Sequence, residues 1–323
     1  MDPVLFGRDI ERTPETLRAL AVSLRAGNPF EPLLARRPVG RRLVLLGMGS
    51  SHFANSVLAL RLQAAGIDAY AALASADPLP AVSADDVVVA VSASGGSAET
   101  LDAIRHYTGK CTTIALTNTA GSLIEAACDV HVSMDAGVED GGVACRSFAH
   151  TLGLHLAIQQ ALTGAGDAAS TIEAAAEASA DLLARRGEWI DAMIELLVGP
   201  DGTAFVAPGR RLSSAQQSAL MMREGPRLPA IACETGDWSH IDVYLTKTTD
   251  YRMLLFTGSP WEAQLLDWCH KRGTTVVALG ADVPGARLSM RYLHDDVDDV
   301  RLLTEPIVAE CIAQSIWFEG AQQ

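Results

Sequence analysis

The feature that most constrains this chain is a repeated alternation of short apolar runs with helix-forming segments. Runs of this kind are typical of strands buried on both faces, and their alternation with helices indicates a parallel sheet covered by helices. The turns that follow them are rich in glycine, serine and threonine. In the first half, strands are expected at residues 42–47, 69–73, 86–91, 113–117 and 130–133.

The same alternation restarts near residue 200, after a helical stretch in which residues 166–182 are expected to form a surface-facing linker helix. Strands are predicted at 203–207, 251–257 and 274–279, and helices at 213–223, 261–272 and 305–319. The two halves therefore repeat one architecture with little sequence identity. We expect a helical lead-in at 1–34, a first domain at 35–165, a linker helix at 166–198 and a second domain at 199–323.

Composition narrows the classes of partner and the compartment. The formal net charge of −14 argues against nucleic acid or an anionic membrane as a partner, because both select basic surfaces. The six cysteines show no metal-binding spacing, and no run reaches the roughly 18–20 apolar residues of a membrane span. The N-terminal residues lack the apolar core of a signal peptide. We therefore expect a cytoplasmic protein with reduced thiols and without a metal or other cofactor.

Two turns rich in glycine and serine stand where a predicted strand passes into a helix. They are Gly47-Met-Gly-Ser-Ser51 and Ser92-Ala-Ser-Gly-Gly-Ser-Ala-Glu-Thr100. In a parallel sheet this is the edge where ligands bind, and the N–H groups at a helix start favour an anion. Serine and glycine are also ordinary turn and capping residues. Because two such turns fall in one predicted sheet, we predict an anion site, and the lack of a Walker lysine or a GxGxxG spacing favours a sugar phosphate over a nucleotide.

Together with Ala136-Gly-Val-Glu-Asp-Gly141 and Arg146-Ser-Phe148, these turns resemble the motifs of the tandem sugar isomerase (SIS) domain proteins, in particular the isomerase half of glucosamine-6-phosphate synthase. The resemblance covers roughly residues 35–320. It implies an α/β fold of two doubly wound, flavodoxin-like parallel-sheet subdomains in tandem. It also implies that Ser51, Ser92 and Ser97 contact phosphate, with Ser50 and Ser94 close by on the sugar side. Where the family often has Gln, this chain has Ala93, so one side-chain donor is absent.

The second half offers a carboxylate and a histidine for proton transfer. An aldose–ketose interconversion needs a base that moves a proton between adjacent carbons and a group that opens the sugar ring. In the resembled isomerases a Glu ends the helix after the first strand of this domain and a His follows 16 residues later, a spacing that Glu224 and His240 share. By resemblance, Glu224 shuttles the proton through a cis-enediolate, and His240 assists ring opening from a neighbouring subunit, which implies a homodimer.

Each of these residues also has a structural interpretation. Glu224 can be a surface charge at a helix end, and His240 a structural histidine with satisfied hydrogen bonds. Glu139 either joins the substrate site or caps a loop. The lysine that forms an imine in the resembled synthase has no counterpart after Lys271, and no glutaminase nucleophile occurs near the N-terminus. Glutamine-dependent amination is therefore not expected.

The leading prediction is a sugar-phosphate aldose–ketose isomerase with one site per subunit, built by the first half and completed by the second. Loss of ammonia from an amino sugar phosphate is a variant of the same chemistry, and a sulfonate can replace the phosphate. The alternative class is a non-catalytic sugar-phosphate sensor. The spacing of Glu224 and His240 favours an enzyme, and the negative charge disfavours a DNA-binding regulator.

Overall fold

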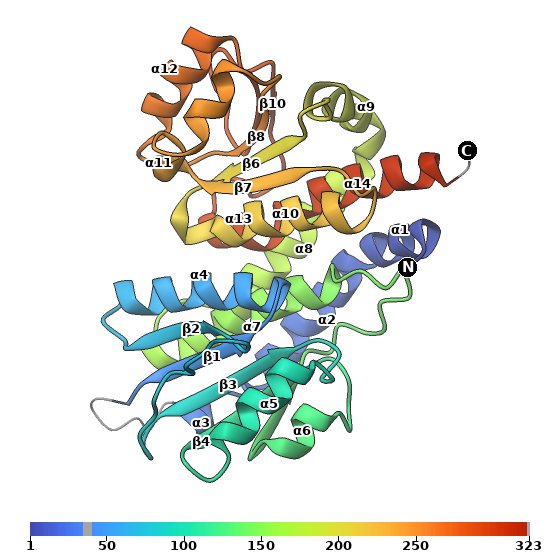
Figure 1. Ribbon diagram of the computed structural model, residues 1–323. Coiled ribbons are helices and arrows are strands. Elements are labelled where there is room, and N and C mark those ends of the chain that lie inside the picture. The colour runs from blue at the N-terminus through green and yellow to red at the C-terminus, as the bar shows by residue number, and fades with distance from the viewer. Residues whose placement is uncertain (35–40, 322–323) are drawn as a thin grey trace. The chain divides into compact units, whose positions relative to one another are not determined.

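The computed structural model describes residues 1–34 and 41–321, so the start predicted for the first domain, residue 35, lies outside the described residues. The chain divides into two compact units, each of which holds one five-stranded sheet (Figure 1). The N-terminal sheet unit consists of Glu15–Glu139 and Arg146–Glu173. The C-terminal sheet unit consists of Met1–Pro14, Asp140–Cys145 and Ala174–Gln323.

In the N-terminal sheet unit, every strand runs parallel to its neighbours, in the order β2-β1-β3-β4-β5. Helices α4 and α7 pack together on one face, while α5 and α6 pack against the other (Figure 1). The elements are α2 (Thr13–Ala26), α3 (Glu31–Leu34), β1 (Leu43–Gly47), α4 (Ser50–Ala64), β2 (Ala69–Leu73), β3 (Val87–Ser92), α5 (Ala98–Tyr107), β4 (Thr112–Thr117), α6 (Leu123–Ala127), β5 (Val130–Ser133), α7 (Arg146–Thr163) and the start of α8 (Ala168–Ala184).

The core of this unit follows from the two-residue period of its strands. Alternate residues of β1 and β3, such as Val44, Leu46 and Val88, are fully buried and lie in one cluster with Ile104 and Tyr107 of α5. Their neighbours along the strands are buried on the opposite face, so both central strands read as continuous apolar runs. Burial of each such side chain contributes about 1.5–3 kcal/mol to the hydrophobic stabilisation.

The C-terminal sheet unit repeats this topology. Its strand order is β10-β9-β8-β6-β7, so the first strand again lies inside the sheet with the second on one side and the third on the other. The repeated α/β architecture expected from the sequence is confirmed. The elements are α1 (Pro3–Glu11), the rest of α8, α9 (Arg186–Leu197), β6 (Thr203–Ala207), η1 (Gly209–Arg211), α10 (Leu212–Glu224), β7 (Ala230–Glu234), α11 (Thr235–Trp238), η2 (Asp242–Lys247), β8 (Arg252–Phe256), α12 (Glu262–Arg272), β9 (Thr275–Leu279), β10 (Leu288–Met290), α13 (Asp298–Thr304) and α14 (Pro306–Gly320).

Three details differ from the sequence prediction. The edge strands β7 and β10 were not predicted, because β7 exposes Ile231 and β10 has only three residues. Helix α4 begins at Ser50, so Ser50 and Ser51 lie in the helix and not in the turn that the sequence indicated. The stretch 166–198 holds two helices, and the prediction that the first is surface-facing was wrong: its alanines are mostly buried, and only a stripe that includes Glu173 and Glu177 is polar. No helix in the described part of the chain combines the length and apolar character needed to cross a bilayer.

A network of buried charges closes the carboxyl edge of the C-terminal sheet. Arg211, which follows β6, is fully buried; its Nε donates to Glu305 Oε2 at 3.1 Å, and its other nitrogens bond the Asp298 carboxylate and the Thr257 carbonyl. Arg301 donates to Glu305 Oε1 at 3.0 Å and to Thr257 Oγ1 at 2.9 Å. Because a buried charge is tolerated only when it is paired, this network fixes the junction of α13 and α14 on the end of β8.

Removal of Arg211 tests this network. We expect Arg211→Ala to lower the free energy of unfolding by about 3–5 kcal/mol, because one oxygen of the buried Glu305 loses its cation. Arg210→Ala is the matched control. Arg210 is 42% exposed and also bonds Asp298, so its loss is expected to lower the stability by less than about 1 kcal/mol. Urea unfolding of both variants measures the difference, and equal losses would show that the buried network is not important for stability.

Candidate functional site

The candidate site lies where the strand order of the N-terminal sheet reverses. β1 and β3 are neighbours, although β2 separates them in sequence. In open α/β sheets, ligands bind outside the carboxyl ends of the strands at such a reversal. The two serine-rich turns follow these two strands, and neighbouring strands lie about 4.8 Å apart. The structure therefore brings together the turns that the sequence analysis singled out.

In the first turn, helix α4 starts almost directly after β1. Only Met48 and Gly49 separate Gly47 from Ser50, and Gly49 has φ 51°, a conformation that glycine adopts readily. Ser50 and Ser51 occupy the first turn of the helix and are half-buried. Among the described residues, neither hydroxyl has a hydrogen-bond partner. Both donors are therefore free at a helix N-terminus, where an anion is favoured.

The second turn begins at Ser92, the last residue of β3, which is 7% exposed. Ser94 is exposed, and its Oγ accepts a hydrogen bond from the Gly96 N–H at 3.3 Å. The proton of the Ser94 hydroxyl remains available to a ligand. Gly95 has φ 61°, and a Cβ at this position would lie 2.2 Å from Ser122 Oγ, so the turn tolerates no side chain here.

Ser97 differs from the other serines because its hydroxyl already has partners. As the N-cap of α5, its Oγ accepts from the Thr100 N–H at 3.3 Å and from Thr100 Oγ1 at 3.1 Å, and it donates to Glu99 Oε2 at 2.9 Å. The backbone N–H of Glu99 and the Ser97 hydroxyl lower the pKa of the Glu99 carboxyl. An anion that uses Ser97 as a donor must displace this carboxylate. Sequence reasoning missed the competition, although an acid two residues after a capping serine signals it.

The sequence leaves two roles open for Glu139, and in the structure its carboxylate caps a helix. Oε1 accepts from the Ser147 N–H at 3.0 Å, and Oε2 accepts from Ser147 Oγ at 2.7 Å. Ser147 lies in the first turn of α7. The buried Arg146 donates to the carbonyls of Ala136 and Val138 in the same loop. Glu139 and Arg146 together fix this loop to the start of α7.

Glu224 is the last residue of α10 and is half-buried. Burial raises the pKa of its carboxyl, and the neighbouring Arg223 lowers it by a smaller amount. The helix ends at Gly225, where a Cβ would lie 3.2 Å from the ring of Trp317 on α14. A carboxyl with a raised pKa suits a group that must both accept a proton and return it.

His240 lies in an exposed turn beyond α11, and its ring has no partner among the described residues. The residues on either side of it are anchored. Trp238 Nε1 donates to Tyr251 Oη at 2.9 Å, and the Tyr251 hydroxyl donates to Asp242 Oδ2 at 3.2 Å. The His240 N–H donates to the Asp237 carbonyl at 2.8 Å. The turn is therefore fixed, whereas the imidazole is open to solvent.

Glu224 and His240 lie at opposite ends of the strands of the C-terminal sheet, Glu224 at the amino ends and His240 at the carboxyl ends. Helix α10 returns from the carboxyl end of β6, so Glu224, its last residue, lies on the side of the sheet where β7 begins at Ala230, which pairs with Thr203 at the start of β6. β7 then runs to the carboxyl end of the sheet, where α11 and His240 follow. Five strand residues span about 13 Å. Glu224 and His240, which the sequence analysis paired by their spacing of 16 residues, therefore do not lie together within this unit.

The strand-order reversal of the C-terminal sheet, at β6 and β8, is filled by side chains of the protein itself. The N–H groups of Gly258 and Ser259, which follow β8, donate to Glu262 Oε1, at 2.7 Å for Ser259. Arg210 donates to the Gly258 carbonyl at 2.9 Å and to Asp298 Oδ2 at 2.9 Å. An internal carboxylate therefore uses the backbone donors that an external anion would need.

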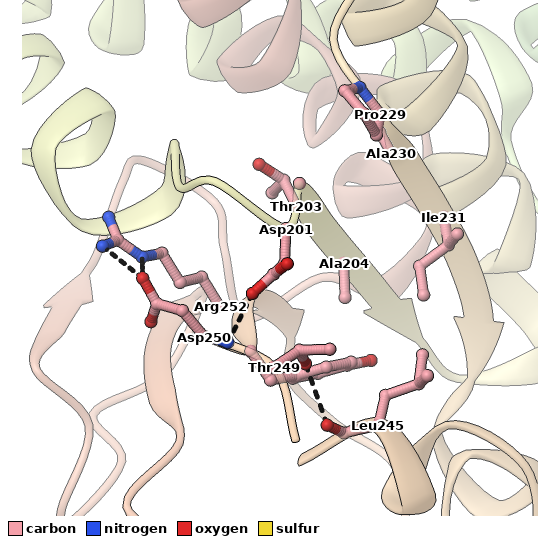
Figure 2. Close-up of a pocket in the computed structure, with 12 residues that line it drawn as sticks. Asp201, Thr203, Ala204, Pro229, Ala230, Ile231, Leu245, Thr249, Asp250 and Arg252 are labelled. Carbon is pink, nitrogen blue, oxygen red and sulfur yellow. Dashed lines mark hydrogen bonds and ion pairs between the residues drawn. The ribbon is translucent and has the colours of Figure 1, made fainter. Parts of the chain in front are cut away.

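The cavity drawn in Figure 2 lies at the other, amino edge of the C-terminal sheet. Ile231 and Leu245 line it, and its charged groups are already engaged. Asp201 Oδ2 accepts from the Asp250 N–H at 2.8 Å, and Arg252 donates to Asp250 Oδ2 from Nε at 2.9 Å and from a terminal nitrogen at 2.6 Å. None of the site residues predicted from the sequence lines this cavity.

Sequence comparison identifies the relatives of the chain. Residues 39–163 match the SIS domain family. The isomerizing glutamine–fructose-6-phosphate aminotransferase of Aeropyrum pernix is 31% identical over 232 residues, which make up 65% of this chain and 37% of that protein. The corresponding protein of Halobacterium salinarum is 31% identical over 254 residues, 74% of this chain and 41% of that protein. The chain thus spans about two-fifths of the length of the curated relatives it matches.

Solved structures show the same fold. The C-terminal domain of glucosamine-fructose-6-phosphate aminotransferase from Francisella tularensis aligns with a TM-score of 0.81 at 17% identity and covers 97% of this chain and 95% of that chain. Tagatose-6-phosphate ketose/aldose isomerase from Escherichia coli aligns with a TM-score of 0.79 at 17% identity and covers 98% and 93%. The family match, the related aminotransferases and the two sheets of one topology agree: residues 39–163 match the SIS domain family, and the chain has the fold of two SIS-type subdomains in tandem.

Proposed function

We propose that this protein is a sugar-phosphate aldose–ketose isomerase. The observation that carries the proposal is the pair of serine-rich helix N-termini at the strand-order reversal of β1 and β3. The helix N–H groups favour an anion, and the hydroxyls of Ser50, Ser51, Ser92 and Ser94 supply donors for its oxygens. The names of the aminotransferase relatives specify fructose 6-phosphate and an isomerizing activity, which supports a sugar phosphate as the anion.

Glu224 is proposed as the base. Isomerisation moves one proton between C1 and C2 of the open-chain sugar through a cis-enediolate, and a second proton passes between the oxygens on the same two carbons. One carboxylate serves both steps: it removes the proton from one carbon and returns it to the other. The raised pKa of Glu224 supports this role, because it increases the population of the acid form from which the proton is returned.

His240 is proposed to open the sugar ring in the site of a second copy of the chain. Within its own unit it lies at the sheet edge opposite Glu224. Apolar side chains that follow it in the chain are exposed: Ile241 by 51% and Tyr244 by 63%. Exposed large apolar side chains favour association, which supports a homodimer.

A second candidate function uses the same anion site without chemistry, as a sugar-phosphate sensor. The Ser97 hydroxyl is bonded to Glu99, and Ala93 supplies no donor, so fewer side chains are free to hold a phosphate. The same observation favours a different anion, such as a sulfonate, over a phosphate. An amino sugar phosphate that loses ammonia remains a variant of the enzymatic proposal, because it needs the same proton transfer.

A ligand screen separates these candidates. Thermal-shift measurements with hexose and hexosamine phosphates, and with a sugar sulfonate, identify compounds that raise the melting temperature. Proton NMR of each hit in deuterated water then follows the C1 and C2 protons. We expect a hit whose C1 or C2 signal disappears while the aldose and ketose interconvert. Binding without exchange would favour the sensor, and release of ammonia would favour the deaminase.

Replacement of the proposed base tests the mechanism directly. We expect Glu224→Gln to slow exchange of the C1/C2 proton with solvent by about 10²–10⁴-fold, because an amide cannot accept the proton. Binding of the sugar phosphate is expected to survive. Glu195→Gln, which changes an exposed glutamate on α9 in the same unit, is the matched control. Unchanged exchange in Glu224→Gln would rule out this base.

The pKa of Glu224 also predicts an effect on stability. Because folding raises this pKa, the ionised carboxylate opposes folding. The contribution of Glu224 to stability is therefore greatest below its unfolded-state pKa of about 4.3 and is lost as the pH rises through the folded-state value. We expect Glu224→Gln to melt above the wild type near pH 7 and level with it near pH 4. A lower melting temperature at neutral pH would contradict the assigned burial.

A further inference from the structure

Asn55 is a fully buried amide that has no hydrogen-bond partner in the part of the chain that the structure describes. It lies on α4, four residues after Ser51, and is 0% exposed. Neither its Oδ1 nor its Nδ2 meets a partner among the described residues. A carboxamide buried with both groups unpaired destabilises a fold, and natural proteins pair almost all such groups. We therefore expect the Asn55 amide to gain a hydrogen-bond partner when a ligand binds.

The amide of Asn55 lies next to Gly47, the residue at which the first serine-rich turn begins. A Cβ placed on Gly47 would be 3.0 Å from Asn55 Nδ2 and 2.8 Å from Ser51 Cβ, so both side chains border the last residue of β1. Residues four apart share one face of a helix, and helical side chains lean toward the N-terminus. The amide is thus aimed at the turn and not away from it.

The backbone acceptors of this turn are already used. The Gly47 carbonyl accepts from the Ala74 N–H at 3.2 Å, and the Met48 carbonyl accepts from the Ser51 N–H at 3.1 Å. Ser51 Oγ, in contrast, has no partner among the described residues. Its lone pairs are the acceptor that Asn55 can reach by a rotation of the Ser51 side chain about its Cα–Cβ bond.

We propose that Asn55 is a positioning residue that aims the Ser51 hydroxyl at the bound anion. The Asn55 Nδ2–H donates to Ser51 Oγ, and the hydroxyl then directs its own proton to an anionic oxygen. Two linked hydrogen bonds polarise each other, so the Ser51 proton becomes a stronger donor. The ligand is a tetrahedral oxyanion such as the phosphate of a sugar ester, and the inference rests on the proposed anion site.

A double-mutant cycle on inorganic phosphate tests this role. We expect Asn55→Ala and Ser51→Ala each to weaken phosphate binding by about tenfold or more, the effect of losing a hydrogen bond to a charged group. Because Asn55 acts through Ser51, the double variant is expected to bind no more weakly than Ser51→Ala alone. Calorimetric titration of the full chain gives the three affinities, and losses that multiply in the double variant would overturn the proposal.

The melting temperature separates positioning from a structural role. If Asn55 is unpaired in the free protein, Asn55→Ala should not lower the melting temperature, whereas loss of a satisfied structural amide should. Ser213→Ala, which removes a buried, unpaired hydroxyl from α10, is the control and should leave phosphate binding unchanged. Asn55→Leu, which fills the same buried space without a donor, separates the loss of the amide from the cavity that alanine leaves, and it is expected to weaken phosphate binding as Asn55→Ala does.

The outcomes also separate this inference from the proposed function. Phosphate binding by Asn55→Ala at the wild-type affinity would overturn the role of Asn55 alone. Absence of phosphate binding by the wild type would overturn both the anion site and the role of Asn55. A failure of the Glu224→Gln exchange experiment would remove the base and leave the phosphate measurements intact.

Discussion

The parallel pairing of β1 with β3 is the interaction on which the candidate site depends. It places the two serine-rich turns at one edge of the sheet, where α4 and α5 begin. A shift of this register by one residue would turn the side chains at the ends of both strands to the opposite face. The apolar residues on both faces of β1 and β3 prevent such a shift, because every residue of the two strands is buried. The geometry of the candidate anion site thus depends on the packing of the core.

Most of the fold and part of the site could be predicted from the sequence, for physical reasons. The central strands are recognisable because they are buried on both faces, and the turns because glycine and serine break the pattern. The edge strands β7 and β10 were not predicted from the sequence, because an edge strand needs little apolar surface. The positions of Glu224 and His240 could not be derived from their spacing, since a strand between them carries one away from the other. The pairing of Ser97 with Glu99 depends on a rotamer, which a sequence does not specify.

The two halves show how one topology can be open or closed to ligands. At the first reversal, the hydroxyls of Ser50 and Ser51 have no partner among the described residues, and the backbone comes close to Ser51 only because Gly47 lacks a side chain. At the second, the carboxylate of Glu262 and the guanidinium of Arg211 take the corresponding places. The repeat therefore supplies one candidate anion site, while its second copy contributes stability and the proposed base.

The opposite placement of Glu224 and His240 has a consequence for how such an enzyme would respond to dilution. If ring opening depends on the His240 of a second copy, while proton transfer depends on Glu224, then ring opening needs two associated chains and proton transfer needs one. An open-chain substrate would be processed at any protein concentration, whereas a cyclic sugar would be processed fully only above the concentration at which two chains associate. Turnover of the cyclic sugar would then fall faster than in proportion to enzyme concentration. In this protein, the step that limits the reaction would be set by the abundance of the chain as much as by its chemistry.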